Sequence, residues 1–202
     1  MGFYSDRILP RLIHWVLGSR DFDKLRRQYL ADAEGTVLEI GFGSGLSLPF
    51  YSPKVRRLLA IEPSDEAWRL AQPAIEKAPF PVERTGKTAE EIPLPGGSVD
   101  TAVSAWTLCT IPDAGRALSE IRRVLKPGGS LCFIEHGLSP EPGVARWQHR
   151  LTPLQKKVAG GCHLDRPIDA MIQSAGFGLE RTDRFYIQGP KIGTYLYAGK
   201  AV

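Results

Sequence analysis

Short apolar runs alternate along the chain with longer stretches in which apolar residues recur every three or four positions. The short runs predict strands and the periodic stretches predict amphipathic helices. The predicted strands are residues 37–40, 58–61, 81–84, 99–104, 130–134, 178–186 and 194–199. Because helices separate most of these strands, the pattern predicts a mostly parallel α/β sheet with helices on both faces, and the last strand forms a hairpin with the one before it.

The N-terminal stretch has helical periodicity but leaves its role open. Apolar residues recur at helical spacing in residues 3–17, at Ile8, Leu12, Trp15 and Val16. This helix either packs on the sheet, covers a bound cofactor as a lid, or lies on a membrane surface. A second, charged helix is predicted at residues 20–33. We therefore expect residues 1–34 to form an N-terminal helical lid and residues 35–202 to form the main domain.

Residues 37–45 join an apolar strand to three glycines at alternate positions, Gly41, Gly43 and Gly45. Glycine at this spacing lets the backbone turn sharply and lie against a ligand where a Cβ would clash. Open α/β sheets bind their ligands at the carboxyl ends of the strands. The run therefore predicts a nucleotide-type binding turn, although a bare Gly-x-Gly-x-Gly is also found in tight turns that serve geometry alone.

Two acidic residues strengthen the interpretation of this turn as a cofactor site. Glu39 lies inside the apolar strand, where a carboxylate is costly to desolvate unless something pairs with it, and a cationic cofactor group is one such partner. Glu62 ends the next strand, about where the second strand of a βαβ unit presents an acid to ribose hydroxyls. Together they predict a cofactor that carries both a cationic group and a ribose.

A nicotinamide dinucleotide and S-adenosylmethionine both fit an acid at the end of the second strand. The dinucleotide pattern is Gly-x-Gly-x-x-Gly, whereas this run is Gly-x-Gly-x-Gly preceded by Glu39. It resembles motif I of the class I S-adenosylmethionine-dependent methyltransferases, and the run Arg-Val-Leu-Lys-Pro-Gly-Gly at residues 123–129 matches the same superfamily. The resemblance implies a Rossmann-like sheet of seven strands, the last one antiparallel, and S-adenosylmethionine as cofactor.

Further cofactor contacts follow from a resemblance to the ubiquinone and menaquinone methyltransferases. These carry Asp-Ala-Glu where this chain has Thr88, Ala89 and Glu90. In the family the acid meets the adenine amino group and the alanine N–H meets the ring; Thr88 keeps an acceptor oxygen without the charge. Ser104 and Trp106 fall at the end of the fourth strand, where the methyl donor is expected, and Trp106 is either a wall of the cofactor site or a core residue.

Residues 137–164 interrupt the alternation of strands and helices. This segment is too long for an ordinary connection between a strand and a helix, so we expect it to bind the substrate. Its motifs resemble the alkyl-thiol S-methyltransferases among the methyltransferase-like proteins; the matching positions are Leu108-Cys109, Glu135-His136, Trp147-Gln148, Leu151, Pro153, Gly161-Cys162, Leu164 and Ala175-x-Phe177. The resemblance implies a small thiol as methyl acceptor.

Five residues are candidates for contact with the acceptor. His136, directly after a strand, is the candidate catalytic base or orienting group, or else a structural histidine. Candidate substrate contacts are Tyr4, Trp147, Cys162 and His163. The spacing of the histidines and cysteines matches no zinc pattern, so we expect no metal. Asp165 is predicted to cap the helix that follows, with Pro167 in its first turn.

Composition limits the remaining choices. The chain has 202 residues, 43% of them hydrophobic, and a formal net charge of +4 without a block of like charges. These values favour one soluble domain with no nucleic-acid partner, and leave peripheral membrane contact through the N-terminal helix open. Three cysteines without a Cys-x-x-Cys pair fit a reducing cytoplasm, and no apolar run is long enough to span a membrane. The oligomeric state stays open.

The sequence thus supports several hypotheses of function. The first is S-methylation of sulfide, methanethiol or a short alkyl thiol, whose reactive form is the thiolate. The alternatives are N-methylation of phosphatidylethanolamine and C-methylation of a quinone ring. From another class, an oxidoreductase that binds a dinucleotide is disfavoured by the glycine spacing, and a cofactor-binding protein without activity remains an alternative.

Overall fold

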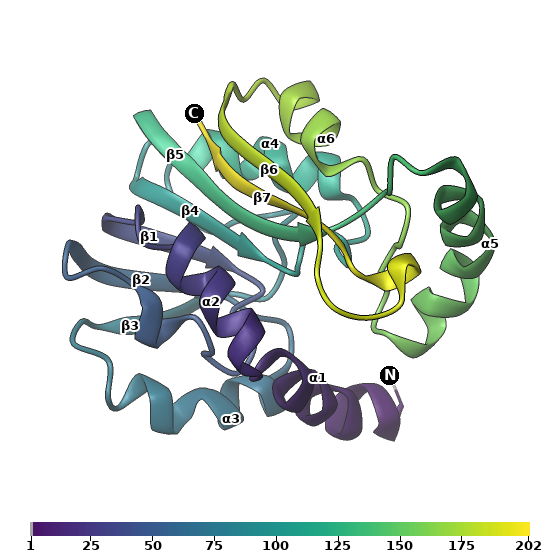
Figure 1. The fold of residues 1–202 in the computed structure, drawn as a ribbon. Helices are drawn as coiled ribbons and strands as arrows, with labels where there is room; N and C mark the ends of the chain where they lie inside the picture. The colour runs from purple at the N-terminus through teal and green to yellow at the C-terminus, as the bar shows by residue number, and fades with distance from the viewer. Residues whose placement is uncertain (1) are drawn as a thin grey trace.

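The apolar runs form one seven-stranded sheet in the order β3-β2-β1-β4-β5-β7-β6, seen in the computed structural model, which describes residues 2–202 (Figure 1). Strands β1 to β5 are parallel, and β7 runs antiparallel to both of its neighbours. This confirms the predicted fold class. The strands are β1 Gly35–Ile40, β2 Val55–Ile61, β3 Val82–Gly86, β4 Val99–Ala105, β5 Leu125–His136, β6 Leu179–Tyr186 and β7 Tyr195–Ala201.

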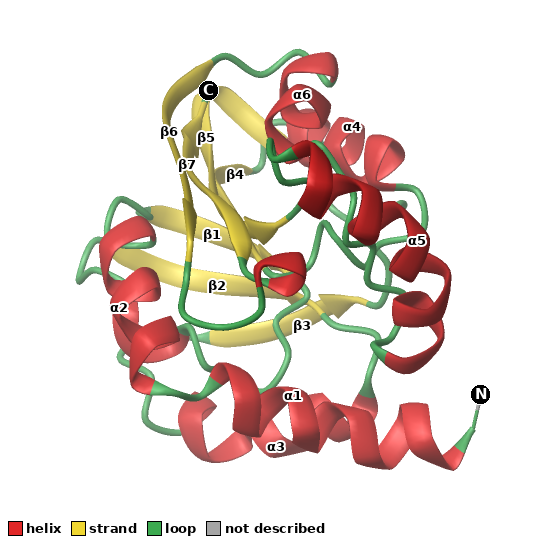
Figure 2. Cartoon of the chain, turned by 45° about the vertical axis from the view of Figure 1, so that its right-hand side comes forward, coloured by secondary structure: helices red, strands yellow, loops and turns green. Residues whose placement is uncertain are grey.

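Helices cover both faces of the sheet, as Figure 2 shows. The α-helices are α1 Leu9–Leu17, α2 Arg20–Tyr29, α3 Asp65–Ile75, α4 Ala114–Val124, α5 Pro142–Val158 and α6 Ile168–Ser174. Shorter helical turns are η1 Tyr4–Ile8, η2 Leu48–Phe50 and η3 Lys191–Gly193. Ser64 caps α3 by accepting from the backbone N of Ala67, and Asp113 caps α4 by accepting from that of Arg116, so side chains set where these two helices begin.

Alternate residues of the central strands fill two separate cores. Leu38 and Leu131 pack with α4 and α6 on one face, whereas Val37 and Cys132 pack with α2 and α3 on the other. A strand covered on both faces needs apolar residues at nearly every position. This requirement explains the uninterrupted apolar runs in the sequence, and it makes the one acid in β1, Glu39, exceptional.

The N-terminal helices lie beside the carboxyl ends of the strands. Nδ1 of His14 in α1 is 2.7 Å from Oγ of Ser44 in the glycine turn, and Arg11 pairs with Glu66 of α3 at 2.9 Å. In α2, the ring of Phe22 meets the edge of Trp106 with 5.1 Å between centroids. Residues far apart in sequence are therefore joined at the same edge of the sheet.

Helix α5 occupies most of the predicted insertion and stands beyond the strand ends, to the right in Figure 1. Gln148 fastens it to the domain: its buried amide donates to the carbonyls of Gly137 and Ile192, each at 3.0 Å, and its oxygen accepts from the backbone N of Ser139 at 2.8 Å. The insertion therefore has a fixed attachment beside the end of β5.

Two local predictions were wrong. Asp165 does not cap α6; its carboxylate accepts instead from Nδ1 of His149 in α5, at 2.8 Å, and no side chain caps the N-terminus of α6. The fifth strand, predicted at residues 130–134, begins earlier, at Leu125, and its Pro-Gly segment lies at a register shift relative to β4. Within residues 2–202, no helix is long and apolar enough to cross a membrane.

Candidate active site

The three glycines form a turn whose backbone only glycine adopts easily. Gly41, Gly43 and Gly45 have φ values of +67°, +60° and +74°. A Cβ on Gly41 would lie 2.2 Å from Oγ1 of Thr107, so this glycine is needed for packing against the loop after β4. A Cβ on Gly43 would meet nothing closer than 3.8 Å. The turn therefore leaves open space beside Gly43, where a ligand could lie against bare backbone.

Glu39 is fully enclosed in β1 beneath this turn. Its Oε2 accepts from the hydroxyl of Tyr51 at 2.9 Å, and Arg26 of α2 is the nearby cation. Burial raises the pKa of Glu39 to about 7, because desolvation outweighs the hydrogen bonds from Ser47 and Tyr51 and the charge of Arg26. A cationic ligand placed beside this carboxyl would favour its charged form further.

Glu62 at the end of β2 holds the turn from the other side. Its Oε2 accepts from the backbone N of Gly43 at 2.6 Å, and its Oε1 accepts from that of Ser64 at 2.7 Å. Burial raises its pKa, although these two hydrogen bonds oppose the effect. Each carboxylate oxygen can accept more than one hydrogen bond, so Glu62 can hold the turn and still receive ligand hydroxyls.

Trp106 follows β4 in a conformation that is costly for a residue with a side chain. Its φ is +56°, in the left-handed region, and Cζ of Arg26 lies 5.0 Å from its ring centroid. The indole N–H is buried without a hydrogen-bond partner among the described residues. A strained residue with an unpaired donor at a strand end is typical of a ligand site. Trp106 also packs against the core on the α2 and α3 face, so both predicted roles, cofactor wall and core residue, stay open.

The remaining predicted cofactor residues lie at the same edge of the sheet but differ in what they face. Ala89 is buried, whereas Thr88 is exposed and its hydroxyl donates to the carboxylate of Glu90. The hydroxyl of Ser104 is fully buried and donates to Oε1 of Glu135 at 2.7 Å. The side chain of Ser104 therefore supports the protein framework, and the hydroxyl of Thr88 is held by Glu90, which matches the glutamate of the family motif.

Glu135 is an organising residue that the sequence interpretation missed. It is fully buried, and besides Ser104 its carboxylate accepts from the backbone N of Thr107 at 3.0 Å and from that of Cys109 at 3.3 Å. One carboxylate of β5 therefore fixes the path of the loop after β4. The available signal was an acid inside an apolar strand, the same signal that identified Glu39.

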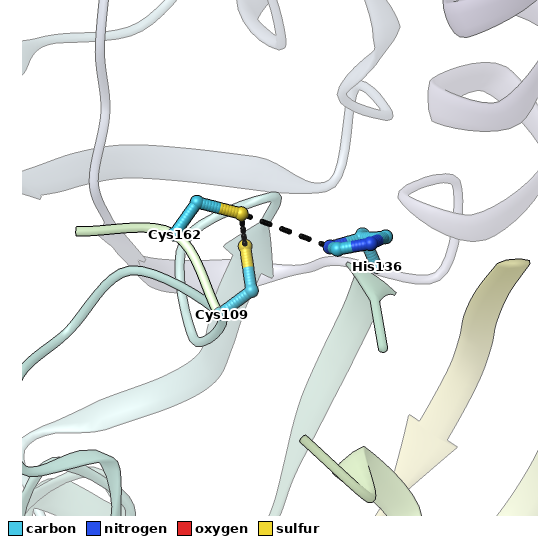
Figure 3. Close-up of side chains that lie close together, drawn as sticks. All are labelled: Cys109, His136 and Cys162. Carbon is cyan, nitrogen blue, oxygen red and sulfur yellow. Dashed lines mark hydrogen bonds between the residues drawn. The ribbon is translucent and has the colours of Figure 1, made fainter. Parts of the chain in front are cut away.

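Cys109, His136 and Cys162 meet at the carboxyl ends of β4 and β5 (Figure 3). Sγ of Cys162 is 3.8 Å from Sγ of Cys109 and 3.8 Å from Nδ1 of His136. The contact with Cys109, and then the contact with His136, lower the pKa of Cys162, whereas the pKa of the more deeply buried Cys109 is raised. Nε2 of His136 is buried and has no partner among residues 2–202.

The other candidate substrate residues are not all brought to this cluster. Nδ1 of His163 is 3.2 Å from the carbonyl oxygen of Cys109, so His163 borders it. Trp147 is 53% exposed on α5, with Arg150 over its ring. Tyr4 is half-exposed, and its hydroxyl donates to the carbonyl of Val158 at the end of α5. Trp147 and Tyr4 therefore have no contact with the cysteine and histidine cluster.

These residues fit S-adenosylmethionine. The open space beside Gly43 could receive a ligand against the backbone, and the buried Glu39 could pair with the ammonium of its amino-acid end. Glu62 could accept from ribose hydroxyls, and Trp106 could form a wall whose indole N–H has no partner among the described residues. All four lie at the carboxyl ends of β1, β2 and β4, where doubly wound sheets bind their cofactors.

Comparison with known proteins agrees with this geometry. Residues 38–133 match the model of a methyltransferase domain. A thiol S-methyltransferase of Rattus norvegicus is 33% identical over 150 residues, which cover 71% of this chain and 60% of the rat protein. A phosphatidylethanolamine N-methyltransferase of Cereibacter sphaeroides is 31% identical over 164 residues, covering 77% of this chain and 79% of that protein. The chain thus spans three fifths of the rat relative and four fifths of the bacterial one.

Solved structures share the fold at lower identity. A methyltransferase of Thermotoga maritima, described as dependent on S-adenosylmethionine and possibly specific for histamine, superimposes with a TM-score of 0.67. It is 22% identical, and the match covers 98% of this chain and 97% of that one. The Bacillus subtilis protein YcgJ gives a TM-score of 0.66 at 20% identity, covering 82% and 72%. Both similarities concern the fold alone, and the first extends over nearly the whole chain.

Proposed function

Because the chain belongs to the S-adenosylmethionine-dependent methyltransferases, we propose that it transfers the methyl group of this cofactor to a small thiol such as sulfide, methanethiol or a short alkyl thiol. The observation that carries the proposal is the buried imidazole of His136, whose Nε2 lacks a partner at the end of β5, directly beside two thiol side chains. The likeness to thiol S-methyltransferases extends over 71% of the chain.

The bound cofactor supplies an activated methyl group on a sulfonium sulfur. The chain has to hold a thiol in line with that group, about 3–3.5 Å away, and exclude water. A thiol with a pKa near 8.5 is only about 3% thiolate at pH 7, so a site that favours the thiolate raises the rate. His136 can take up or orient the thiol proton. Glu135 holds the loop that carries Cys109 in place, because its carboxylate accepts from the backbone N of Cys109.

The N-terminal helices are proposed to cover the cofactor. His14 contacts Ser44 of the glycine turn, and Phe22 and Arg26 contact Trp106. These contacts join α1 and α2 to both ends of the proposed cofactor site. A cover in this position would exclude water from the reacting groups.

The test of thiol methylation is product identification. Purified protein is incubated with S-adenosylmethionine and ethanethiol, and the headspace is analysed for ethyl methyl sulfide while S-adenosylhomocysteine is measured in solution. We expect equal amounts of both products. The control is the Gly43→Ala variant, which places a methyl group in the open space beside Gly43 and should form neither product. If the native protein binds S-adenosylmethionine but forms no more thioether than this variant, the thiol proposal is wrong.

A phospholipid amine is the second candidate acceptor, and the surface of the N-terminal helices favours it. Apolar side chains at the start of η1 and along α1 are exposed. Phe3, which precedes η1, is 76% accessible and Trp15 is 77% accessible, whereas Leu12, Ile13 and Val16 are each a little under half exposed. An amphipathic helix of this kind can lie in the interface of a bilayer. The relative from Cereibacter sphaeroides methylates phosphatidylethanolamine according to its name.

Replacing Glu39 by glutamine is expected to raise the stability of the cofactor-free protein and to lower its affinity for S-adenosylmethionine. The pKa of Glu39 is raised in the folded chain from 4.5 to about 7, so its contribution to stability is fully present below pH 4.5 and is lost as the pH rises through about 7. At pH 8 the buried charge therefore lowers the free energy of unfolding by at most about 3 kcal/mol. The neutral amide of Glu39→Gln removes this cost. The affinity for S-adenosylmethionine should fall by about tenfold or more, because the cationic group loses its partner.

Thermal unfolding of both cofactor-free proteins between pH 5 and 8 checks this prediction. The variant should melt about 5–10 °C above the native protein at pH 8, and most of the difference should be gone at pH 5. Titration calorimetry with S-adenosylmethionine at pH 8 gives the loss of affinity. If the difference in melting temperature between the two proteins were the same at pH 5 and pH 8, the raised pKa of Glu39 would be contradicted.

A further inference from the structure

Cys109, His136 and Cys162 come from three segments of the chain but present one donor atom each to a common point. Cys109 lies in the loop after β4, His136 ends β5, and Cys162 follows the two glycines after α5 (Figure 3). The three donor atoms all lie within 4.8 Å of one another. Cys109 and His136 are buried and Cys162 is half-buried, so the cluster is enclosed apart from one side.

We propose that these three residues bind one divalent ion of borderline softness, such as Zn²⁺. The fourth coordination position of this ion then receives the acceptor thiol. The inference rests on the proposed function for the identity of that fourth ligand. The metal site itself follows from the three protein ligands. Two thiolates and an imidazole are donors that zinc prefers, and sites with three protein ligands are those that keep a position open for a reactant.

The distances suit a tetrahedral ion. Two sulfur atoms that each bind zinc at about 2.3 Å in a tetrahedron are about 3.8 Å apart, and a sulfur and an imidazole nitrogen are about 3.6 Å apart. The sulfurs of Cys109 and Cys162 are 3.8 Å apart, and Sγ of Cys162 is 3.8 Å from Nδ1 of His136. The third edge, from Cys109 to His136, is at most 4.8 Å, so it has to shorten by roughly 1 Å at most.

No fourth protein ligand is available among the described residues of this cluster. Glu135, the acid next in sequence to His136, is occupied by Ser104 and by the backbone N of Thr107 and of Cys109. Arg166, which hydrogen-bonds the carbonyl of Leu108, adds a positive charge near both cysteines. Two thiolates, a third thiolate from the acceptor and Zn²⁺ sum to one negative charge, which Arg166 offsets. The surroundings therefore fit an ion with one position left for an anionic sulfur.

The loop after β4 places this cluster next to the cofactor site. Thr107 packs against Gly41 of the glycine turn, since a Cβ on Gly41 would overlap its side chain, and Cys109 follows two residues later. Two residues span at most about 7 Å. A thiol bound at the fourth position would therefore be within reach of a methyl group presented over the glycine turn.

The transfer step balances with the thiol, the cofactor and water alone. When the acceptor R–SH binds the ion, its proton leaves to water and its sulfur binds as thiolate, because a metal-bound thiol is deprotonated at neutral pH. In this form of the site His136 is a ligand of the ion, so it orients the thiol through the metal and does not take up the thiol proton. A lone pair of that sulfur then forms the new S–CH₃ bond as the S–CH₃ bond of the sulfonium breaks. The products are a neutral thioether, which binds the ion weakly and leaves, and S-adenosylhomocysteine. No oxidant or reductant takes part.

Metal binding can be measured without turnover. Reduced, chelator-treated protein is titrated with Co²⁺, whose absorption reports tetrahedral thiolate coordination, and Zn²⁺ content is then measured by mass spectrometry after exchange. We expect one ion per chain and a change in the Co²⁺ spectrum when ethanethiol is added. Cys162→Ser and His136→Ala should each lower the affinity by at least about tenfold. Cys162 is half-buried, so Cys162→Ser keeps the test valid if a change at the buried Cys109 prevents folding.

Matched controls separate the site from general effects. Cys132→Ala removes the third cysteine, which lies in the core on the α2 and α3 face, and His149→Ala removes a histidine paired with Asp165; both should bind the ion as the native protein does. Failure of the reduced protein to bind a stoichiometric ion would overturn the metal site, as would unchanged affinity in Cys162→Ser. A protein that methylates ethanethiol equally well without metal would overturn this inference and leave the thiol function standing.

A site that binds one ion but whose Co²⁺ spectrum does not respond to ethanethiol would overturn the role of the open position. If that protein also formed no ethyl methyl sulfide, the proposed function would fail as well. The metal titration and the product measurement therefore distinguish the two proposals.

Discussion

Glu62→Ala is expected to weaken the binding of S-adenosylmethionine by about 100-fold or more. The carboxylate has two roles that alanine cannot fill: it would accept from the ribose hydroxyls, and it already holds the backbone N–H groups of Gly43 and Ser64. Hydrogen bonds to a charged acceptor contribute about 1.5–3 kcal/mol each, so losing the acceptor and loosening the turn together account for the factor. Titration calorimetry on the purified variant measures it.

Glu62→Gln is the matched control for this change. Glutamine keeps one acceptor oxygen but presents an NH₂ group to a position where the protein has only backbone donors, so one of the two N–H groups loses its partner. We expect an affinity between those of the native protein and Glu62→Ala, with the fold retained by circular dichroism. Unchanged affinity in the alanine variant would mean that the end of β2 does not bind the ribose.

Gly41→Ala and Gly43→Ala are expected to separate folding from cofactor binding, although both glycines have positive φ. Alanine in this region costs about 1–2 kcal/mol at either position. At Gly41 the new methyl also overlaps Thr107, at 2.2 Å, which adds a cost of about 1–3 kcal/mol. The melting temperature of Gly41→Ala should therefore fall by about 6–12 °C, about twice the loss in Gly43→Ala.

The order of effects reverses for cofactor binding. A methyl group on Gly43 points into open space, 3.8 Å from its nearest neighbour, and this is the space in which the cofactor has to lie. Gly43→Ala should therefore lower the affinity for S-adenosylmethionine by about 100-fold or more while the chain stays folded. Melting curves and calorimetry on the two variants test both halves. A Gly43→Ala protein that binds S-adenosylmethionine with native affinity would show that the cofactor does not occupy the space beside Gly43.

Features that depend on neighbouring residues were predictable from the sequence. The strands follow from apolar runs that two helical layers require, and helix α3 follows from its cap at Ser64. Glu39 and Glu62 were found because an acid in an apolar strand has to be explained by a partner. In each case a few consecutive residues are enough to explain why the strand, the helix or the site residue occurs at that position.

Features that depend on distant contacts were not predictable. Cys109, His136 and Cys162 are separated by 27 and 26 positions, and no zinc-like spacing relates them, so only the fold brings their donor atoms together. Trp106 has a left-handed backbone, and its backbone N–H donates to the carbonyl of Ile134 in β5; neither feature is suggested by its sequence neighbours. Asp165 has the residue type and position of a cap, but His149 of α5 offers its carboxylate a hydrogen-bond partner instead.

The most direct measurement of the central claim is a competition in one vessel. Purified protein receives methyl-labelled S-adenosylmethionine together with ethanethiol and phosphatidylethanolamine vesicles, and label is counted separately in the volatile fraction and in extracted lipid. The proposed function predicts label in ethyl methyl sulfide and none in lipid above a control without protein. Label in the lipid alone would contradict it, and would assign the exposed face of η1 and α1 to a membrane-bound acceptor.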